Sequence, residues 1–204
     1  MSATASGLLP LAIDWLRRQY PTSVIVPEFS IGAWGAALID VAAICEDQII
    51  GIEIKGDGDS PTRIKLQAAV YSKAADRMFL LPAPSLQARC FKAAPRSWGQ
   101  LALVDGSIVR AEPHEWSRSN EPERLHIAAG QILQALWRDE LDMIARVREV
   151  MIGRRLSKEG LRDHLAEHLP LSIIRTEVCA ALRRRNWALH GKRVYAPIVE
   201  AEAA

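Results

Sequence analysis

GIEIKGDGDSPTRIKLQAAVY, residues 51–71, contains the sequence pattern from which the fold is most readily predicted. At its start, Ile52 and Ile54 share one face of an expected strand, and Glu53 and Lys55 lie side by side on the other face. The strand is apolar enough to be expected at the centre of a sheet, where charged side chains are uncommon. The pair therefore suggests function, and the alternative is a surface ion pair on an edge strand.

The flanking segments predict an α/β (α+β) fold with a central mixed sheet flanked by helices. Period-two runs predict strands, and helical spacing predicts helices. The first three strands form an antiparallel meander, and a helical crossover places the fourth strand parallel to the third. In chain order we expect a helix at 8–20, strands at 24–29, 37–44 and 49–55, a helix at 62–75, a strand at 77–84, a short helix at 85–92, and a hairpin at 99–113 that turns at Asp105-Gly106.

The chain after residue 120 differs in composition and pattern. A polar linker at 114–123 precedes a helical pattern that continues to Trp187 with breaks near Gly153 and Pro170. From Arg146 to Arg193 there are 12 Lys/Arg and 5 Asp/Glu, although the whole chain carries a net charge of only +2. We therefore predict two domains, a core at 1–120 and a basic helical subdomain at 121–204.

Composition narrows the class of protein. With 204 residues and 49% hydrophobic residues, the chain can bury a sizeable core. Three widely spaced cysteines without a C-x-x-C pair indicate reduced thiols and a cytoplasmic location. The N-terminus lacks a secretory pattern and no apolar run approaches 18 residues, so we expect no membrane span.

A carboxylate on the preceding strand gives the charged pair a chemical meaning. Ile39 and Val41 are expected on one face of that strand and Asp40 on the other, next to Glu53. Two adjacent carboxylates repel unless a cation lies between them, and Mg²⁺ or Mn²⁺ prefers oxygen ligands. Lys55 could then position a water or stabilise charge on a phosphate. These are the parts of metal-assisted phosphodiester hydrolysis.

The following helix adds a polar stripe. Arg63, Gln67 and Tyr71 recur at intervals of four residues on an otherwise apolar helix, so they can face the same site. The alternative is a solvated helix face.

These residues resemble a known signature. Asp40, twelve intervening residues and Glu53-Ile54-Lys55 look like the D-x(n)-(D/E)-x-K motif of the PD-(D/E)xK restriction-endonuclease-like superfamily. Gln67-Ala-Ala-Val-Tyr71 resembles the Q-x-x-x-Y element of RecB-type members. The chain departs from the pattern at Ile39, where many members have proline. The segments RSWGQLALVDG, ALWRDEL and LRRRNW are similar to an uncharacterised bacterial group of this superfamily.

The resemblance implies a metal-dependent nuclease with a restriction-endonuclease-like core. Its catalytic residues would be Asp40, Glu53, Lys55, Gln67 and Tyr71. Asp40 and Glu53 would bind Mg²⁺ or Mn²⁺, with the Ile54 backbone carbonyl as a further ligand. Glu28, one strand upstream, is equally balanced between a ligand and an exposed strand residue. The substrate would be DNA, with RNA left open, and neither endo- nor exonuclease action nor the oligomeric state follows from the sequence.

The basic C-terminal segment has two interpretations. Helix, turn at Pro170, helix and a short extended arm resemble a winged helix-turn-helix. In that case the C-terminal cations would contact nucleic acid, namely Arg183, Arg184, Arg185, Lys192 and Arg193. Arg63 of the polar stripe is a separate candidate for such a contact. The alternative is a helical cap on the core, since arginines at a helix C-terminus are favoured by the macrodipole without DNA.

Two further groups of residues are expected to be structural. His164, Glu167 and His168 match an H-x-x-E-H zinc pattern, but we expect an ordinary amphipathic helix there. Asp57 and Asp59 are expected to be loop acids, because GDGDSP does not follow a calcium-loop pattern. Besides the nuclease, two hypotheses stay open: a catalytically idle nucleic-acid-binding protein on a nuclease fold, and a regulatory interaction protein of a mobile element.

Overall fold

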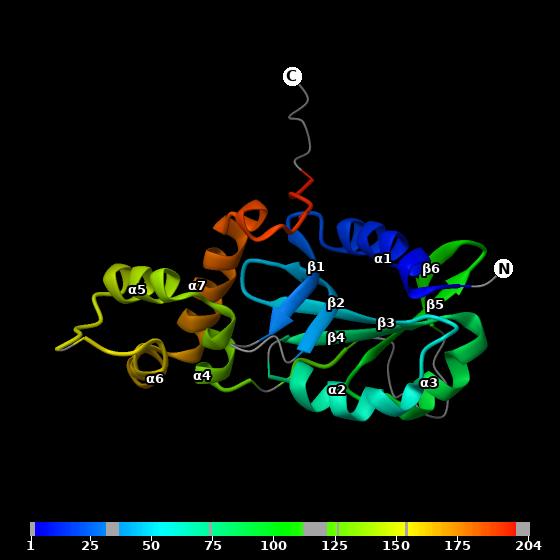
Figure 1. The fold of residues 1–204 in the computed structure, drawn as a ribbon, viewed down its shortest axis with the longest axis horizontal. Helices are drawn as coiled ribbons and strands as arrows, with labels where there is room; N and C mark the ends of the chain where they lie inside the picture. The colour runs from blue at the N-terminus through cyan, green and yellow to red at the C-terminus, as the bar shows by residue number, and fades with distance from the viewer. Residues whose placement is uncertain are drawn as a thin grey trace, which may run out of the picture.

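A six-stranded mixed sheet forms the centre of the molecule (Figure 1). The computed structural model describes residues 3–31, 37–73, 75–111, 122–125, 127–153 and 155–198. The strands lie side by side in chain order, as β1 (Val24–Ile31), β2 (Ala37–Ile44), β3 (Ile49–Lys55), β4 (Arg77–Pro82), β5 (Gly99–Val104) and β6 (Ser107–Arg110). The strand that carries Glu53 is therefore central, as predicted.

The pairing directions follow the predicted connections. β1, β2 and β3 form the antiparallel meander, and β3 pairs in parallel with β4 after the helical crossover. β4 and β5 are also parallel, and β5 and β6 form the predicted hairpin. Asp105 and Gly106 have φ angles of 48° and 78°, the left-handed values that a two-residue type I′ turn requires. The expected turn at 30–36 and the linker at 114–123 lie largely outside the described residues.

Helices cover both faces of the sheet (Figure 1). α1 (Ala5–Gln19) packs on one face over the apolar side of β3, in a cluster that includes Ile50, Ile52 and Ile54. The 3₁₀ turn η1 (Pro61–Arg63), α2 (Ile64–Tyr71), η2 (Pro84–Leu86) and α3 (Gln87–Ala93) lie on the other side. The charged face of β3 therefore meets α2, the crossover helix.

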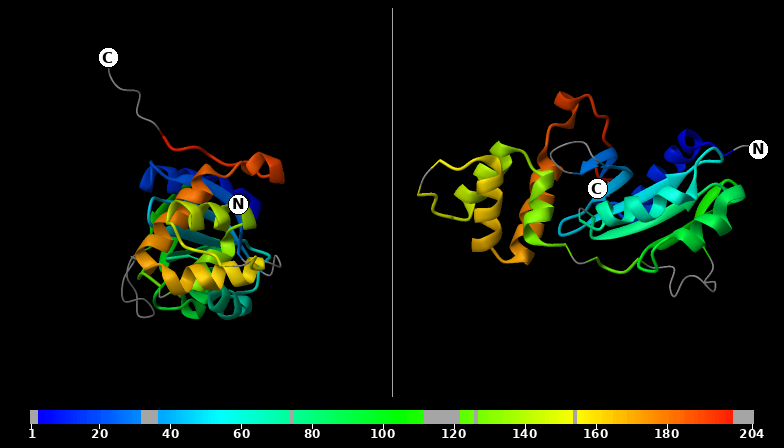
Figure 2. Two further views of the ribbon diagram at one scale, coloured as in Figure 1. Left: turned by 90° about the vertical axis from the view of Figure 1, so that its left-hand side faces the viewer. Right: turned by 60° about the horizontal axis from the view of Figure 1, so that its bottom comes forward.

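The C-terminal helices pack beside the β1–β2 end of the sheet (Figures 1 and 2). In chain order they are α4 (Ala129–Ile132), η3 (Leu133–Ala135), α5 (Arg138–Val147), α6 (Lys158–His168), α7 (Leu171–Arg184) and η4 (Trp187–His190). Breaks near Gly153 and Pro170 separate α5 from α6 and α6 from α7, as predicted, and a further break at the extended residues Leu136 and Trp137 separates η3 from α5. No helix of the described residues is long and apolar enough to cross a bilayer.

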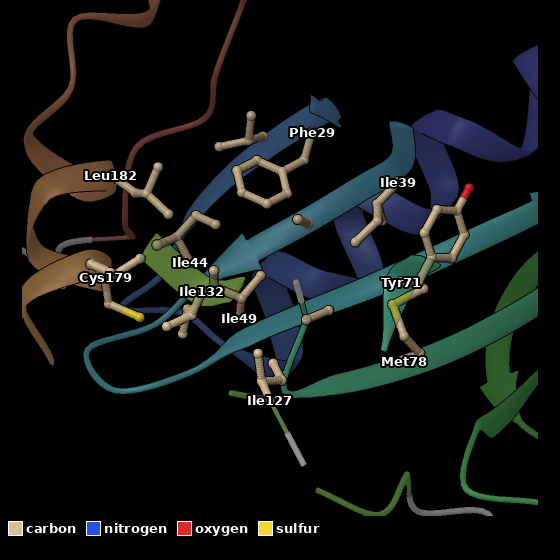
Figure 3. Packing of buried hydrophobic residues seen from close by; sticks show 14 of the residues in the cluster. Phe29, Ile39, Ile44, Ile49, Tyr71, Met78, Ile127, Ile132, Cys179 and Leu182 are labelled. Carbon is tan, nitrogen blue, oxygen red and sulfur yellow. The ribbon is translucent and has the colours of Figure 1, made fainter. Parts of the chain in front are cut away.

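One hydrophobic cluster joins the sheet to the C-terminal helices. Phe29 and Ile44 of the first two strands lie in the same cluster as Ile132 of α4 and Leu182 of α7 (Figure 3). The core thus continues across the predicted boundary at residue 120.

The C-terminal arm also returns to the sheet. Tyr195 forms an isolated antiparallel bridge with Ile25 of β1. The described residues after α7 contain no β-hairpin that could serve as a wing, so the expected winged-helix form is not seen there.

Candidate active site

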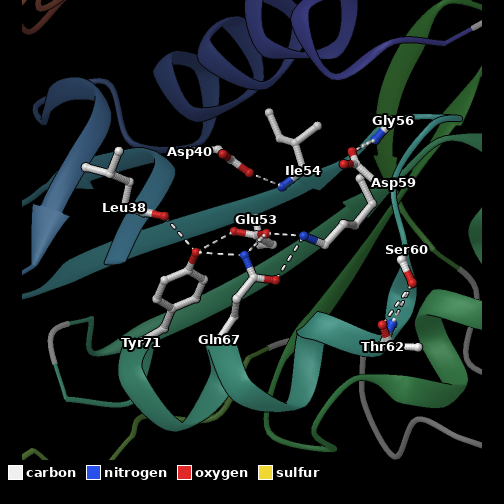
Figure 4. Close-up of polar contacts among 11 residues, drawn as sticks. Leu38, Asp40, Glu53, Ile54, Gly56, Asp59, Ser60, Thr62, Gln67 and Tyr71 are labelled. Carbon is white, nitrogen blue, oxygen red and sulfur yellow. Dashed lines mark hydrogen bonds and ion pairs between the residues drawn. The ribbon is translucent and has the colours of Figure 1, made fainter. Parts of the chain in front are cut away.

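The sheet opens between β2 and β3 at Asp40. Antiparallel pairing of these strands stops at Val41↔Ile52. Just beyond it, Oδ2 of Asp40 accepts a hydrogen bond from the Ile54 backbone N–H at 2.6 Å (Figure 4). A side chain thus continues the strand contact, and this brings Asp40 to the charged end of β3.

The side chains next to Asp40 do not alternate as predicted. Ile39 packs in the large cluster on the α2 side of the sheet, whereas Val41 packs under α1. We expected both on one face, and the prediction for Ile39 was wrong. The reason lies in the neighbouring strand pair: the ladder between β1 and β2 skips Glu28 and Asp40, and Glu28 has a left-handed φ of 49°. Such an irregularity shifts the phase of side chains along a strand.

Glu53 accepts hydrogen bonds from three other side chains of the site. Its Oε1 accepts hydrogen bonds from Lys55 Nζ at 2.5 Å and Gln67 Nε2 at 2.6 Å, and its Oε2 accepts from the Tyr71 hydroxyl at 2.9 Å. Glu53 is 2% exposed and Lys55 is 5% exposed, on a central strand. The alternative of a surface ion pair on an edge strand is therefore wrong.

Gln67 links the two charged groups from α2. While Nε2 of its amide donates to Glu53, its Oε1 accepts a hydrogen bond from Lys55 Nζ at 2.9 Å (Figure 4). The amide of Gln67 therefore contacts both the carboxylate and the ammonium. This orientation comes from helical spacing on a helix that crosses over the charged face of β3.

Tyr71 lies one turn further along α2 and is also turned inward. Its hydroxyl lies 2.6 Å from the Leu38 carbonyl and 2.9 Å from Glu53, so its single proton can serve one of these acceptors at a time. The ring stacks on Trp98 with centroids 6.1 Å apart and planes at 15°. Tyr71 is 2% exposed, so the alternative of a solvated helix face does not hold for it.

Burial and mutual repulsion disfavour ionisation of both carboxyl groups, Asp40 and Glu53, at the same time. Burial raises the pKa of Asp40 to about 7, with further increases from the charge of Glu53 and a hydrogen bond to it; the Ile54 N–H and Lys55 act in the opposite direction. Burial, then the charge of Glu53, also raises the pKa of Tyr71 well above its usual value. Tyr71 is therefore a hydrogen-bond donor at neutral pH. A cation close to Asp40 would stabilise the ionised form of its carboxyl group.

The donor set fits a hard divalent cation. The Ile54 N–H donates to Oδ2 of Asp40 and not to Oδ1, so this backbone contact uses one oxygen of the carboxylate. Glu53 supplies a second carboxylate, and its charge disfavours ionisation of Asp40 when no cation is near. The Ile54 backbone is adjacent to this pair. Glu28, by contrast, is exposed, and no three carboxylates of the described residues gather here with their oxygens within 4.8 Å of one another. The structure thus brings two of the predicted acidic ligands together and leaves Glu28 apart.

The neighbouring loop residues have structural contacts. Asp57 accepts a hydrogen bond from the Ala3 N–H at 2.6 Å, and Asp59 accepts one from the Gly56 N–H at 2.7 Å. Both behave as loop acids, as expected. Arg63 is exposed at the end of η1, so it does not share the inward orientation of the other two members of its predicted stripe.

Arg185 is part of the helical core. Its Nη2 lies 2.5 Å from a carboxylate oxygen of Glu140, and its guanidinium lies 3.8 Å from the centroid of the Trp137 ring and 4.8 Å from that of Trp187. The Arg185 side chain is 5% exposed. The structure therefore gives Arg185 a packing role in place of the predicted nucleic-acid contact.

The other predicted C-terminal cations are more accessible. Arg184 and Arg193 are exposed. Arg183 lies 3.9 Å from a carboxylate of the turn after β2, and Lys192 Nζ donates to the backbone carbonyl of Glu28. These contacts connect the segment to the β1–β3 meander, which is the behaviour expected of a helical cap.

The histidines of α6 lie together on its surface. Among the described residues, His164, Glu167 and His168 are the one set of three potential ligands with atoms within 4.8 Å of one another. His164 Nε2 lies 3.0 Å from the Met151 carbonyl, and His168 Nδ1 lies 2.8 Å from the His164 carbonyl. The two leucines of this helix are buried, as expected for an amphipathic helix.

Two cations of α3 were not among the predicted site residues. The short helix was expected, but Arg89 and Lys92 were given no role. Together with Lys65 of α2 they line a groove on the α2–α3 side of the sheet. Their spacing of three residues on one helix face was a signal, although a sequence cannot show that a second helix lies alongside.

Comparisons with known proteins identify a family and one solved structure. Residues 11–192 match the family described as Bacteriophage P4 protein cII. A solved structure described as "SPO1766 protein of unknown function from Silicibacter pomeroyi" is 20% identical, with 74% of this chain and 97% of that chain covered and a TM-score of 0.45. No curated protein matches.

Proposed function

We propose that this chain, which belongs to the family of bacteriophage P4 protein cII, is a cytoplasmic, metal-dependent nuclease that hydrolyses phosphodiester bonds in DNA. One observation carries the proposal: a central strand and its crossover helix bring Asp40, Glu53, Lys55, Gln67 and Tyr71 into one hydrogen-bonded cluster. A buried cluster of this kind is costly for stability, and residues with perturbed pKa values gather at functional sites. The resemblance to the PD-(D/E)xK superfamily supports the same conclusion.

Asp40 and Glu53 would hold Mg²⁺ or Mn²⁺, with the Ile54 carbonyl as a further oxygen ligand. Such an ion, when bound, supplies Lewis-acid polarisation of a phosphate and lowers the pKa of water. In the metal-free arrangement Glu53 accepts from two donors at Oε1 and from one at Oε2, so Oε2 is the oxygen with more capacity left for a cation. The flexible side chain of Lys55 can exchange Glu53 for another anion.

Each protein group then has a definable task. Lys55 is placed to orient an attacking water or to neutralise charge that develops on the phosphate. Gln67 keeps the Lys55 ammonium close to the carboxylates, since it accepts from Lys55 while donating to Glu53. Tyr71 remains protonated and fixes Glu53 through its hydroxyl.

Asp40→Asn is the sharpest test of this chemistry. Asn keeps an oxygen that can accept from the Ile54 N–H, but it removes a charged ligand. We expect cleavage of linear, nicked, circular and single-stranded substrates with Mg²⁺ or Mn²⁺ to be lost, and wild-type cleavage to stop in EDTA. Lys55→Ala should reduce the rate by ~10²–10³-fold, the effect of removing a typical electrostatic group.

Asp59→Asn is the matched control. Asp59 also accepts from a backbone N–H, but it lies in the loop after β3. This variant should cleave like wild type. If wild type cuts no substrate with either metal, the nuclease proposal fails; equal cutting by Asp40→Asn would place the activity elsewhere.

A second candidate is a regulatory interaction protein of a mobile element. The family description names a bacteriophage protein, which agrees with such a setting. In that case the wild-type protein would bind a partner without metal-dependent cleavage. A catalytically idle nucleic-acid-binding protein would instead bind DNA in a salt-dependent way and leave it uncut.

A further inference from the structure

A groove next to the candidate active site carries positive charge alone. It has a volume of about 530 Å³ and lies between the start of α2 and the end of α3. Its lining consists of Pro61, Thr62, Lys65, Arg89, Lys92 and Ala93. The lining thus combines an apolar floor with three cations and includes no acidic residue.

The three cations are not held in ion pairs by other described residues. Lys65, Arg89 and Lys92 are exposed, and among the residues that the structure describes no ion pair engages any of them. Many other arginines of the molecule, such as Arg175 and Arg185, are held by carboxylates. Like charges gathered on one surface repel each other, so this arrangement favours an anionic occupant.

Two helices, α2 and α3, connect the groove to the candidate active site. α2 carries Lys65 on its outer side and Gln67 on its inner side, so one helix faces both the groove and Glu53. α3 contributes Arg89, and the adjacent Cys90 lies within electrostatic reach of both Lys55 and Arg89. Burial raises the pKa of Cys90, and both of these charges act against that rise.

We propose that this groove binds the sugar–phosphate backbone of the nucleic acid next to the scissile bond, with phosphates at Lys65, Arg89 and Lys92. The proposal rests on the proposed nuclease function. Three cations along one groove can each contact a phosphate, and the apolar floor suits the sugars between the phosphates. The Thr62 side chain adds a hydroxyl that can donate to a phosphate oxygen.

Binding can be separated from chemistry in the Asp40→Asn background. Anisotropy of a labelled DNA duplex, measured in EDTA from 50 to 200 mM NaCl, gives affinity and its salt dependence. The triple variant K65Q/R89Q/K92Q should bind at least about tenfold more weakly at low salt. Its log–log salt slope should be shallower by about 2 to 3, since each neutralised phosphate contributes ~0.9.

A charge-matched control separates local contacts from net charge. R146Q/R155Q/K158Q removes three positive charges from the C-terminal helical part and should leave affinity and slope close to those of the parent. Equal losses in both triple variants, or no loss in the groove variant, would overturn the groove proposal while wild-type cleavage still upheld the nuclease. Wild type that neither binds nor cleaves DNA would refute both. Circular dichroism and thermal melting verify that each variant is folded.

Discussion

At the scale of single residues, the feature that most needs an explanation is Asp40. A carboxyl group with a pKa of about 7 in the folded protein holds its proton more tightly than the same group in the unfolded chain, where the pKa is near 4. From pH 4 to pH 7 the unfolded state therefore gains from ionisation and the folded state does not. In metal-free protein, ionisation of Asp40 therefore lowers the free energy of unfolding as the pH rises from 4 to 7, and above pH 7 its effect no longer changes with pH.

Asp40→Asn should remove that loss. We expect the variant to be about 1–3 kcal/mol more stable than wild type at pH 8, less than a full shift would give because Asp40 is partly exposed and screened. At pH 4 the two proteins should be nearly equal. Urea unfolding at several pH values in EDTA measures the difference, with Asp59→Asn as control. A difference independent of pH, or a less stable variant at pH 8, would contradict the electrostatic explanation.

Glu53 behaves differently because its charge is already compensated. In the wild type, three side chains donate hydrogen bonds to the two oxygens of Glu53. A glutamine at this position has one side-chain oxygen to accept them. Repulsion between adjacent carboxylates would by itself make Glu53→Gln stabilising in the metal-free protein. The structure argues against this, since the buried Lys55 would lose its carboxylate partner.

At the scale of elements, the end of α7 shows how neighbouring arginines acquire different roles. Arg184 points to solvent, whereas Arg185 lies between two tryptophan rings and is paired with Glu140. The helix ends at Arg184, so the next side chain leaves the helical spiral and turns toward α5. A run of three arginines is therefore not one continuous basic surface.

Arg185→Ala should lower the free energy of unfolding by about 3 kcal/mol. The change leaves the carboxylate of Glu140 without its partner in a partly buried position and removes the stacking with both rings. Arg184→Ala is the adjacent control and should change stability by less than about 0.5 kcal/mol. Denaturant unfolding of the two variants gives the comparison, and similar values for both would refute the assigned roles.

At the scale of the whole molecule, the sheet and the C-terminal helices share a core. Phe29 of β1 and Trp187 of η4 make an edge-to-face ring contact with centroids 6.3 Å apart. Asp76, fully buried before β4, lies 2.9 Å from Arg175 of α7, and it accepts a hydrogen bond from the Ile49 N–H that begins β3. Apolar and ionic contacts thus connect the strand of the candidate site to the last long helix.

A fragment of residues 1–120 should not fold as an independent unit. Removing the helices exposes one side of the shared core and leaves the buried carboxylate of Asp76 without Arg175, a loss of about 3–5 kcal/mol for the ion pair alone. We expect no cooperative thermal transition and aggregation on size-exclusion chromatography. The full chain should unfold in a single transition seen equally by circular dichroism and tryptophan fluorescence. A cooperative, monomeric fragment would show that the boundary at residue 120 separates real domains.

The helices and strands of the sheet and the principal residues of the candidate site were predictable from the sequence. Period-two and helical patterns are local, so they placed the meander, the crossover and the hairpin correctly. The same periodicity placed Glu53 and Lys55 on one face of β3 and turned Gln67 and Tyr71 inward from α2, because spacing along regular elements fixes side-chain direction.

Tertiary structure decided what depends on contacts between distant segments. The irregular pairing at Glu28 and Asp40 changed the face of Ile39, and the approach of α5 to the end of α7 turned Arg185 into a core residue. The groove at Lys65, Arg89 and Lys92 exists because α2 and α3 lie together. Residue patterns specify direction within one element, whereas burial, pairing and shared surfaces arise only when elements meet.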